Sequence, residues 1–202
     1  MQKEFWNNRY ATGEYIFGRE PNVFFKSVID TLSPGKIFIP GAGEGRDAVY
    51  AAIKGWDVYC IDLSNVGRDK ALKLANEKNV SISYEVKDII DVDFAENHFD
   101  AIAGIFFHLP TNIRTVFHQN AGKWLKQGGQ YFTEVYHPLQ LNNTSGGPKE
   151  IDMLVTSQFL TSELKDLEII KNSEEETILA EGIRHVGKAN VVRFIGKKTS
   201  TI

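Results

Sequence analysis

Short apolar runs alternate with helical patterns over residues 21–136, which is typical of βαβ units around a mostly parallel sheet. Residues 21–32 carry apolar side chains at i, i+3, i+4 and i+7, which predicts a helix with one buried stripe. Ser64 and Thr111 are placed to cap two later helices. Five strands are predicted, at residues 36–40, 57–61, 81–86, 99–106 and 130–136. We therefore expect a doubly wound α/β sheet with helices on both faces.

The pattern changes after the fifth predicted strand. Residues 137–166 contain the polar, turn-rich run NNTSGGP, which neither a strand nor a long helix can absorb. Long irregular segments of this kind often form lids or binding loops. Residues 167–179 and 189–197 then predict two long strands, and the connection between them is short enough for an antiparallel hairpin.

The composition narrows the class of protein. The chain has 202 residues, 42% of them apolar, and a formal net charge of −3, which suits one ordinary globular domain. The mildly acidic balance argues against nucleic acid as a partner, and no apolar run approaches the ~20 residues that a membrane span needs. The N-terminus does not look like a signal peptide, and the single cysteine, Cys60, excludes an internal disulfide and a thiolate-rich zinc site. We expect a cytoplasmic protein without a metal, either a monomer or a weak homodimer.

A glycine-rich turn, Gly41-Ala42-Gly43-Glu44-Gly45, lies between the first predicted strand and the next helix. Glycine permits positive φ and lets a ligand approach the bare backbone, and a helix N-terminus offers unpaired N–H groups to an anion. The third glycine comes one position too early for the dinucleotide motif G-x-G-x-x-G, which argues against NAD and FAD. A plain tight turn is the alternative interpretation.

Two acidic residues follow the next two predicted strands. Asp62 comes directly after the second strand, where a carboxylate can accept both hydroxyls of an adenosine ribose. Asp88 follows the third strand and can accept from an adenine amino group, while Ile89 packs against the ring. The alternatives are that Asp62 only caps a helix and that Asp88 is a solvated loop residue. Because the carboxyl ends of parallel strands share one edge of the sheet, these groups are expected to converge on one crevice.

From Gly35 to about Phe132 the chain resembles a class I S-adenosylmethionine-dependent methyltransferase. The pieces that carry this resemblance are PGAGEGRDA, IDLS, KDI, FDAI leading into IFFHLP, and LKQGG. The terminal stretches FWNNRYATGEYIFGREPNVFF and EGIRHVGKANVVRF resemble the branch that contains the tellurite-resistance and thiopurine methyltransferases. One departure is Ile39, which stands where the class usually has an acidic residue.

The resemblance implies a Rossmann-like, seven-stranded, mostly parallel sheet and S-adenosyl-L-methionine as cofactor. It divides a single domain, residues 1–202, into an N-terminal cap (1–33), a cofactor-binding core (34–136), a lid-like insertion (137–166) and a C-terminal hairpin (167–198). The residues expected to bind the cofactor are Gly41, Ala42, Gly43, Arg46, Asp62, Leu63, Asp88, Ile89, Ile105 and Tyr15.

Histidines are the candidate catalytic residues, because histidine titrates near neutral pH. His108 lies just past the fourth predicted strand, where the class places its transferred methyl group. His185 lies in the predicted hairpin, where the tellurite-resistance relatives have a histidine thought to act on substrate, although Val186 replaces the arginine that follows it there. His137 ends the fifth strand, and His118 is expected to be a surface residue.

The N-terminal segment is unusually aromatic, and aromatic faces attract a cation such as a sulfonium. Tyr15 is expected to be the ring nearest the cofactor, with Arg9 or Arg19 reaching an anionic substrate. The alternative is that these rings only dock the segment on the core.

The sequence therefore predicts an S-adenosylmethionine-dependent methyltransferase acting on a small-molecule acceptor, for example a soft nucleophile such as a thiol or a selenium or tellurium oxyanion. Two alternatives stay open: a non-catalytic S-adenosylmethionine-binding module, and a nucleotide-dependent oxidoreductase, which the glycine spacing disfavours.

Overall fold

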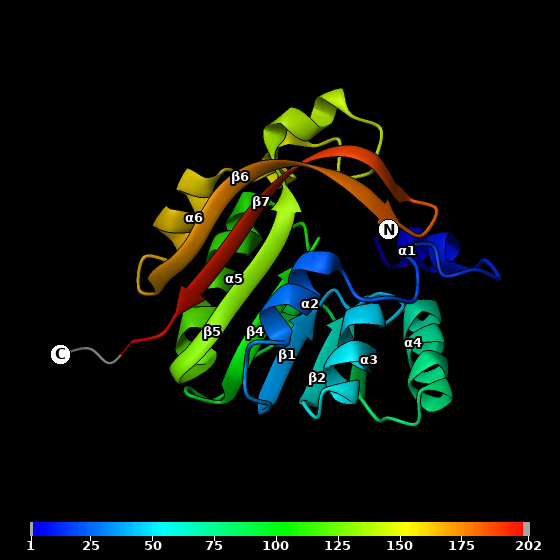
Figure 1. Cartoon of the computed structure of the whole chain (residues 1–202), viewed down its shortest axis with the longest axis horizontal. Coiled ribbons are helices and arrows are strands. Elements are labelled where there is room, and N and C mark those ends of the chain that lie inside the picture. Colours follow the sequence, from blue (N-terminus) through cyan, green and yellow to red (C-terminus); the bar gives the residue numbers. More distant parts are fainter. Residues whose placement is uncertain (1, 200–202) are drawn as a thin grey trace.

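The computed structural model describes residues 2–199 and is built on one seven-stranded sheet (Figure 1). The strand order is β3-β2-β1-β4-β5-β7-β6; the first five strands are parallel, and β7 runs antiparallel to both β5 and β6. The predicted sheet with its C-terminal hairpin is thus confirmed. The strands are β1 (Lys36–Pro40), β2 (Asp57–Asp62), β3 (Ser83–Val86), β4 (Phe99–Ile105), β5 (Leu125–Tyr136), β6 (Glu168–Glu181) and β7 (His185–Lys197).

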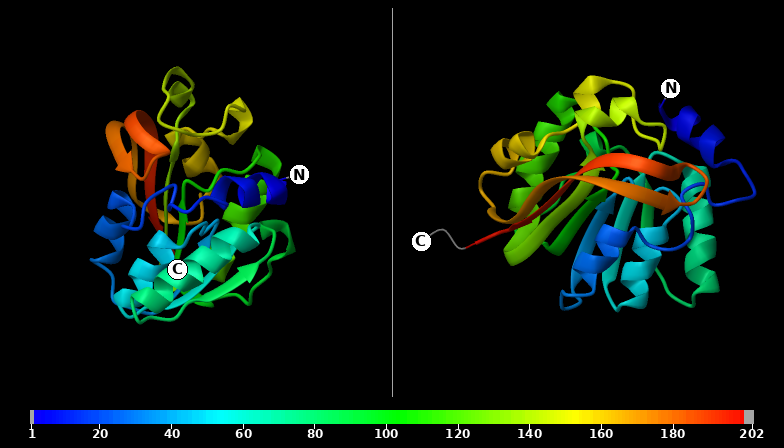
Figure 2. Two further views of the ribbon diagram at one scale, coloured as in Figure 1. Left: turned by 90° about the vertical axis from the view of Figure 1, so that its right-hand side faces the viewer. Right: turned by 45° about the horizontal axis from the view of Figure 1, so that its top comes forward.

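Helices cover both faces of the sheet, as Figures 1 and 2 show. Within residues 2–199, no helix combines the length and the apolar character that crossing a membrane requires. The α-helices are α1 (Gln2–Tyr10), α2 (Val23–Ile29), α3 (Arg46–Ile53), α4 (Asn65–Glu77), α5 (Thr111–Trp124) and α6 (Ser157–Glu163), and the short 3-10 helices are η1 (Ile89–Asp91), η2 (Pro138–Asn142) and η3 (Ile151–Met153).

Two apolar cores hold the layers together. Side chains alternate between the faces of a strand, so Ile37 and Ile39 of β1 pack with α2 and α3, whereas Phe38 between them packs with α5 and α6 on the other face. These β1 residues are almost fully buried, which explains why the strand is a continuous apolar run rather than an alternating one.

Local capping sets where the helices begin. Ser64 caps α4 as predicted, because its hydroxyl accepts from the N–H of Gly67 at 3.0 Å. The expectation for Thr111 is wrong: Pro110 is the N-cap of α5, and Thr111 is the first helical residue. The N–H of Thr111 instead donates to the Asp152 carboxylate at 3.0 Å, which ties the helix to the irregular segment after β5.

The N-terminal segment and the hairpin meet at one end of the molecule (Figure 1). The carbonyl of Ile16 accepts from the backbone N–H groups of Ile183 and Arg184, at 3.0 and 3.2 Å, in the turn between β6 and β7. At the neighbouring Gly18 and Gly182 the two backbones are so close that a β-carbon on Gly182 would lie 2.4 Å from the backbone nitrogen of Gly18. The hairpin turn is therefore anchored by residues that precede the sheet in sequence.

Candidate active site

The glycine turn joins β1 to α3 with a backbone that only glycine adopts easily. Gly41, Gly43 and Gly45 have φ values of 64°, 53° and 87°. A β-carbon on Gly41 would overlap the ring of Phe107, which follows β4, and one on Gly43 would lie 2.7 Å from the hydroxyl of Tyr10. The glycines therefore allow the tight turn and also let the side chains of Phe107 and Tyr10 approach the backbone closely.

Asp62, at the end of β2, holds the glycine turn in place. One carboxylate oxygen accepts from the N–H of Gly43 at 3.0 Å, and the other accepts from the N–H of Ser64 at 2.9 Å. Burial raises the pKa of Asp62, and these backbone bonds oppose the shift. Each carboxylate oxygen keeps a further lone pair, so Asp62 can still accept from two ribose hydroxyls. Ser64, not Asp62, provides the side-chain cap of α4.

The other residues expected to bind the cofactor lie at the same edge of the sheet. Leu63 follows Asp62, and the carbonyl of Asp62 accepts from the N–H of Lys87, which joins the ends of β2 and β3. Asp88 caps η1 by accepting from the N–H of Ile90 at 3.3 Å, and Ile89 is buried. Ile105 is the last residue of β4 and is also buried.

Tyr10 rather than Tyr15 packs on Gly43 in the glycine turn, where the Tyr84 hydroxyl also donates to the carbonyl of Gly43 at 2.8 Å. The Tyr10 side chain is buried between Gly43 and Gly67, and its ring stacks on Trp6 at 5.4 Å between centroids. The Tyr15 hydroxyl instead donates to the carbonyl of Lys70 on α4, and its ring lies under the charged groups of Lys70 and Arg19. The expectation that Tyr15 is the ring nearest the cofactor stays a prediction.

Asn7 fixes α1 against the start of α4. Its side-chain oxygen accepts from the Ser64 hydroxyl at 2.7 Å, and its amide donates to Asn65 at 3.0 Å. The sequence did not predict a role for Asn7; its aromatic N-terminal residues indicated only that this segment could dock on the core.

The structure does not bring the Arg46 side chain to Asp62. Its guanidinium donates to the Glu181 carboxylate at 2.8 Å and to the carbonyl of Phe17 at 2.9 Å. Burial would raise the pKa of Glu181, but His185 and Arg46 lower it to about 2. Arg46 thus forms a buried ion pair with the hairpin, and no sequence signal identified Glu181 as its partner.

His108 lies on the ring of Tyr136, with 5.4 Å between centroids and 11° between planes. Its Nδ1 is 3.3 Å from the carbonyl of Met153, and its Nε2 is buried without a hydrogen-bond partner. A carbonyl can only accept, so Nδ1 carries the proton and Nε2 presents a lone pair. Burial lowers the pKa of His108 to about 4, which keeps the ring neutral near pH 7.

His185 is buried among aromatic rings. Its ring centroid is 4.4 Å from Phe17 and 4.5 Å from Phe106, and its Nδ1 is 3.6 Å from Glu181. Burial lowers the pKa of His185, and Glu181 opposes the shift. Phe106 has a φ of 49°, which ends β4 one residue earlier than predicted. We call the five rings that meet here the aromatic cluster: Phe17, Phe106, His108, Tyr136 and His185.

Three histidines lie outside the aromatic cluster: His98, which precedes β4, His118 and His137. His118 is buried, which corrects the expectation of a surface residue, and its ring nitrogens contact Glu163 at 2.7 Å and the Tyr131 hydroxyl at 3.1 Å. His137 accepts from the N–H of Leu139 and lies 3.4 Å from Glu174.

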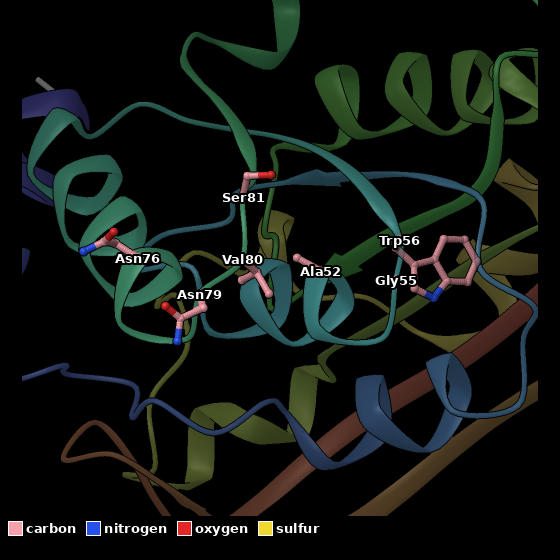
Figure 3. Close-up of a pocket in the computed structure, with 7 residues that line it drawn as sticks. All are labelled: Ala52, Gly55, Trp56, Asn76, Asn79, Val80 and Ser81. Atoms are coloured by element: carbon pink, nitrogen blue, oxygen red, sulfur yellow. The ribbon is translucent and has the colours of Figure 1, made fainter.

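A surface hollow at the opposite edge of the sheet contains none of the predicted site residues (Figure 3). It is formed mainly by the ends of α3 and α4 and by the loops that lead into β2 and β3. Its lining residues are Ala52, Gly55, Trp56, Asn76, Asn79, Val80 and Ser81.

An open α/β sheet that carries a glycine turn and an acidic residue at the carboxyl edge of its central strands is the architecture of a nucleotide-cofactor-binding enzyme. Residues 38–129 match the family described as "Methyltransferase domain". This match covers less than half of the chain and lies over the glycine turn and the first strands of the sheet, and it implies S-adenosylmethionine as the methyl donor of this region.

Two curated relatives are phosphoethanolamine N-methyltransferases. The Triticum aestivum protein, phosphoethanolamine N-methyltransferase 1, is 31% identical over 137 residues, which are 67% of this chain and 26% of that protein. The Plasmodium falciparum (isolate 3D7) protein is 29% identical over 164 residues, which are 71% of this chain and 60% of that protein. The chain therefore spans less than two thirds of either relative.

Solved structures share the fold at low identity. TehB from Haemophilus influenzae has a TM-score of 0.73 at 18% identity, covering 98% of this chain and 67% of that chain. The N-methyltransferase NodS from Bradyrhizobium japonicum WM9 has a TM-score of 0.68 at 14% identity, covering 88% and 93%.

Proposed function

We propose that the protein transfers the methyl group of S-adenosylmethionine to a small-molecule acceptor held in the aromatic cluster. The observation that carries this proposal is the contact between Gly41 and Phe107, because it sets the loop after β4 directly against the glycine turn. His108 is the next residue in that loop, so the candidate acceptor side adjoins the candidate cofactor side.

The residues fit the cofactor. The bare backbone at Gly43 leaves no room for a side chain, and Asp62 keeps lone pairs for two hydroxyls. We assign Asp88, Ile89 and Leu63 to the adenine side, because they directly follow the ends of β3 and β2. The bound sulfonium supplies the reactive methyl group, so the protein's contribution is alignment and the exclusion of water.

His108 orients the acceptor in this proposal. Its neutral ring has a free lone pair on Nε2, which can accept a hydrogen bond from an N–H, O–H or S–H group of the methyl acceptor. This hydrogen bond would orient the nucleophilic atom so that its lone pair faces the methyl group. His185, the other candidate catalytic residue, packs on Phe106 in the same aromatic cluster. A soft nucleophile such as a thiol or a chalcogen oxyanion needs only this positioning, whereas an amine must also arrive deprotonated.

The same proposal gives roles to the segments outside the core. The N-terminal residues 2–33 act as a cap over the cofactor, because Tyr10 lies on Gly43. Residues 137–166 act as a lid over the acceptor, because the Met153 carbonyl contacts His108. We further assign the chain to the branch of the tellurite-resistance and thiopurine methyltransferases; its terminal motifs support this assignment, and the likeness of its fold to TehB is compatible with it.

Calorimetric titration with S-adenosylhomocysteine tests the cofactor, with NAD as the comparison. We expect binding of the first and none of the second. Turnover is then measured as release of S-adenosylhomocysteine with tellurite, selenite, a thiol and phosphoethanolamine as acceptors. Absence of S-adenosylhomocysteine binding would refute the proposal, and binding without turnover of any acceptor would favour the non-catalytic module.

A matched pair of variants tests His108. His108→Gln is expected to lower turnover at least tenfold and leave S-adenosylhomocysteine affinity unchanged, because the residue lies on the acceptor side. His98→Gln, just before β4 at its opposite end, is the control and is expected to turn over normally. Equal turnover in the two variants would remove His108 from the proposal.

A further inference from the structure

The guanidinium of Arg114 is buried where α5 meets α6, and all three of its nitrogens donate hydrogen bonds. Nε and Nη2 donate to the two carboxylate oxygens of Glu163, at 3.1 and 3.0 Å, which makes a bidentate pair. Nη2 also donates to the Thr111 hydroxyl at 3.2 Å. Nη1 donates to two main-chain carbonyls, that of Asp152 at 3.0 Å and that of Leu109 at 3.4 Å. The ion pair with Glu163 therefore uses only part of the guanidinium fork.

The two main-chain carbonyls flank the hydrogen bond between His108 and Met153. Leu109 follows His108 in the loop after β4, and Asp152 precedes Met153 at the end of η3. One nitrogen of Arg114 thus binds both segments that meet in this hydrogen bond. Because that bond places the proton of His108 on Nδ1, the position of the two segments decides which ring nitrogen keeps a lone pair.

Asp152 ties η3 to α5 a second time. Its carboxylate accepts from the N–H of Thr111 at 3.0 Å and from the Thr111 hydroxyl at 2.6 Å, at the first residue of the helix. The Asp152 side chain is exposed, so these bonds can be removed without opening a cavity in the core. We call Arg114, Thr111, Asp152 and Glu163 the arginine clamp.

Glu163 fixes the other end of the arginine clamp. Its carboxylate also lies 2.7 Å from Nδ1 of His118 and accepts from the Thr115 hydroxyl at 3.2 Å. Burial would raise the pKa of Glu163, but His118 and Arg114 lower it to about 2, so the carboxylate stays ionised near neutral pH. A lysine could pair with this carboxylate, but its single ammonium group lacks the planar fork that also reaches two carbonyls. Arginine is therefore required by the two carbonyls rather than by the ion pair.

We propose that Arg114 is a positioning residue for His108. The arginine clamp holds the Met153 carbonyl against Nδ1 of His108, and this contact leaves the Nε2 lone pair for the methyl acceptor. The inference rests on the proposed function, in which His108 orients the acceptor. It deepens that function, because the segment after β5 does more than cover the acceptor: it sets which nitrogen of His108 carries the proton.

The first experiment reads the protonation of His108 directly. Nitrogen NMR of the full chain with isotope-labelled histidine distinguishes a ring protonated on Nδ1 from one protonated on Nε2, and His108→Gln identifies the His108 signals. The measurement needs neither cofactor nor acceptor. In the wild type at neutral pH, we expect a neutral ring with its proton on Nδ1.

Arg114→Lys keeps the positive charge and removes the fork. We expect its His108 ring to populate both tautomers, so that the Nδ1 and Nε2 signals move towards each other. Arg193→Lys is the matched control, because Arg193 also pairs with carboxylates, those of Glu134 and Glu175, and has no part in the arginine clamp. Its His108 signals should match the wild type.

Asp152→Ala tests the arginine clamp without changing Arg114. It removes both bonds of the carboxylate to α5, and we expect the His108 signals to shift in the same direction as in Arg114→Lys. Thr156→Ala is its control, because the Thr156 hydroxyl caps α6 by accepting from the N–H of Phe159 at 3.3 Å. Loss of that cap should leave the His108 signals unchanged.

Unchanged His108 signals in an Arg114→Lys protein that is folded by circular dichroism would overturn the inference. A wild-type ring protonated on Nε2, or an equal shift in Arg193→Lys, would also overturn it. Where Arg114→Lys does not fold, the signals of Asp152→Ala decide in the same way.

The second experiment asks whether Arg114 acts through His108. Turnover is measured as release of S-adenosylhomocysteine with the acceptor, among tellurite, selenite, a thiol and phosphoethanolamine, that the wild type methylates. We expect Arg114→Lys to lower kcat at least tenfold and to leave S-adenosylhomocysteine affinity unchanged. The double variant of Arg114→Lys with His108→Gln should turn over as fast as His108→Gln alone, because two residues that act as one unit are not additive. Losses that add in the double variant, or wild-type kcat in Arg114→Lys, would contradict the inference.

Failure of the proposed function is read separately. Absence of S-adenosylhomocysteine binding to the wild type refutes that function, whereas the histidine signals of the free protein still report on the arginine clamp.

Discussion

Replacing Asp62 by asparagine changes two atoms at the centre of the candidate cofactor site. Both carboxylate oxygens now accept from backbone N–H groups, of Gly43 at 3.0 Å and of Ser64 at 2.9 Å. An amide has one oxygen and one NH2 group, so in Asp62→Asn one of these N–H donors must face another donor. The variant also loses its negative charge and at least one acceptor for a ribose hydroxyl.

The magnitude follows from the missing acceptors. A hydrogen bond to a charged group is worth about 1.5–3 kcal/mol, so removal of one ribose contact should weaken S-adenosylhomocysteine binding by roughly 10- to 150-fold. The backbone bond broken in the free protein should also lower the free energy of unfolding, by about 1–3 kcal/mol. Because burial raises the pKa of Asp62, wild-type affinity should fall as the pH is lowered, while the affinity of Asp62→Asn should stay flat.

Calorimetry with S-adenosylhomocysteine measures the affinity, and urea unfolding of the free protein measures the stability. Asp57→Asn is the matched control, because Asp57 begins the same strand at the opposite edge of the sheet and its side chain is 71% exposed. We expect the control to bind like the wild type. A folded Asp62→Asn protein with wild-type affinity at neutral pH would refute the assignment of the ribose site to Asp62.

Two further predictions concern the glycine turn and His108. Gly43→Ala forces a side chain into a φ of 53° and to within 2.7 Å of Tyr10, so S-adenosylhomocysteine affinity should drop at least tenfold in calorimetry; Gly122→Ala, which has open space in α5, should instead raise the free energy of unfolding in urea by about 0.5–1 kcal/mol. The pKa of His108 is about 4 in the folded protein against 6.5 ordinarily, so the unfolded chain binds a proton that the folded chain refuses, and stability is lost as the pH falls through this window, by about 3 kcal/mol in full. Between pH 7 and pH 4.5, His108→Gln should therefore lose less stability in urea unfolding than the wild type. Burial raises the pKa of Asp47 to about 6, which changes stability in the opposite direction, but this contribution is the same in both proteins. Equal losses of stability would contradict a buried neutral His108.

The fold was predictable mainly because strands buried on both faces leave continuous apolar runs, as β1 and β4 do. β3 has no buried residue and follows instead from the alternation of its polar and apolar residues. The end of β4 was less predictable: Phe106 takes a left-handed φ of 49°, which apolar periodicity does not encode. The start of α5 was misplaced by one residue for a related reason. Asp152, far along the chain, satisfies the N–H of Thr111, so no local cap was needed.

The candidate site could be predicted where a residue acts through its backbone or its strand position. Gly43 and Asp62 follow from their places after β1 and β2, and the structure joins them by a hydrogen bond. Side-chain direction could not be predicted in the same way. Arg46 begins α3, but its guanidinium turns to Glu181, which is 135 residues away in sequence. Likewise, packing of α1 on α4 decides that Tyr10 rather than Tyr15 reaches the glycine turn.

The N-terminal segment links the two sides of the candidate site. Tyr10 packs on Gly43, and seven residues later Phe17 packs on His185 and accepts from Arg46. Asn22, further along, donates to carboxylates of β5 and β6. A single stretch of chain therefore touches the glycine turn, the aromatic cluster and the hairpin, so looser packing at one end weakens the docking of the other. This explains why so many aromatic residues precede the first strand: their burial supplies the free energy that holds the N-terminal segment in place.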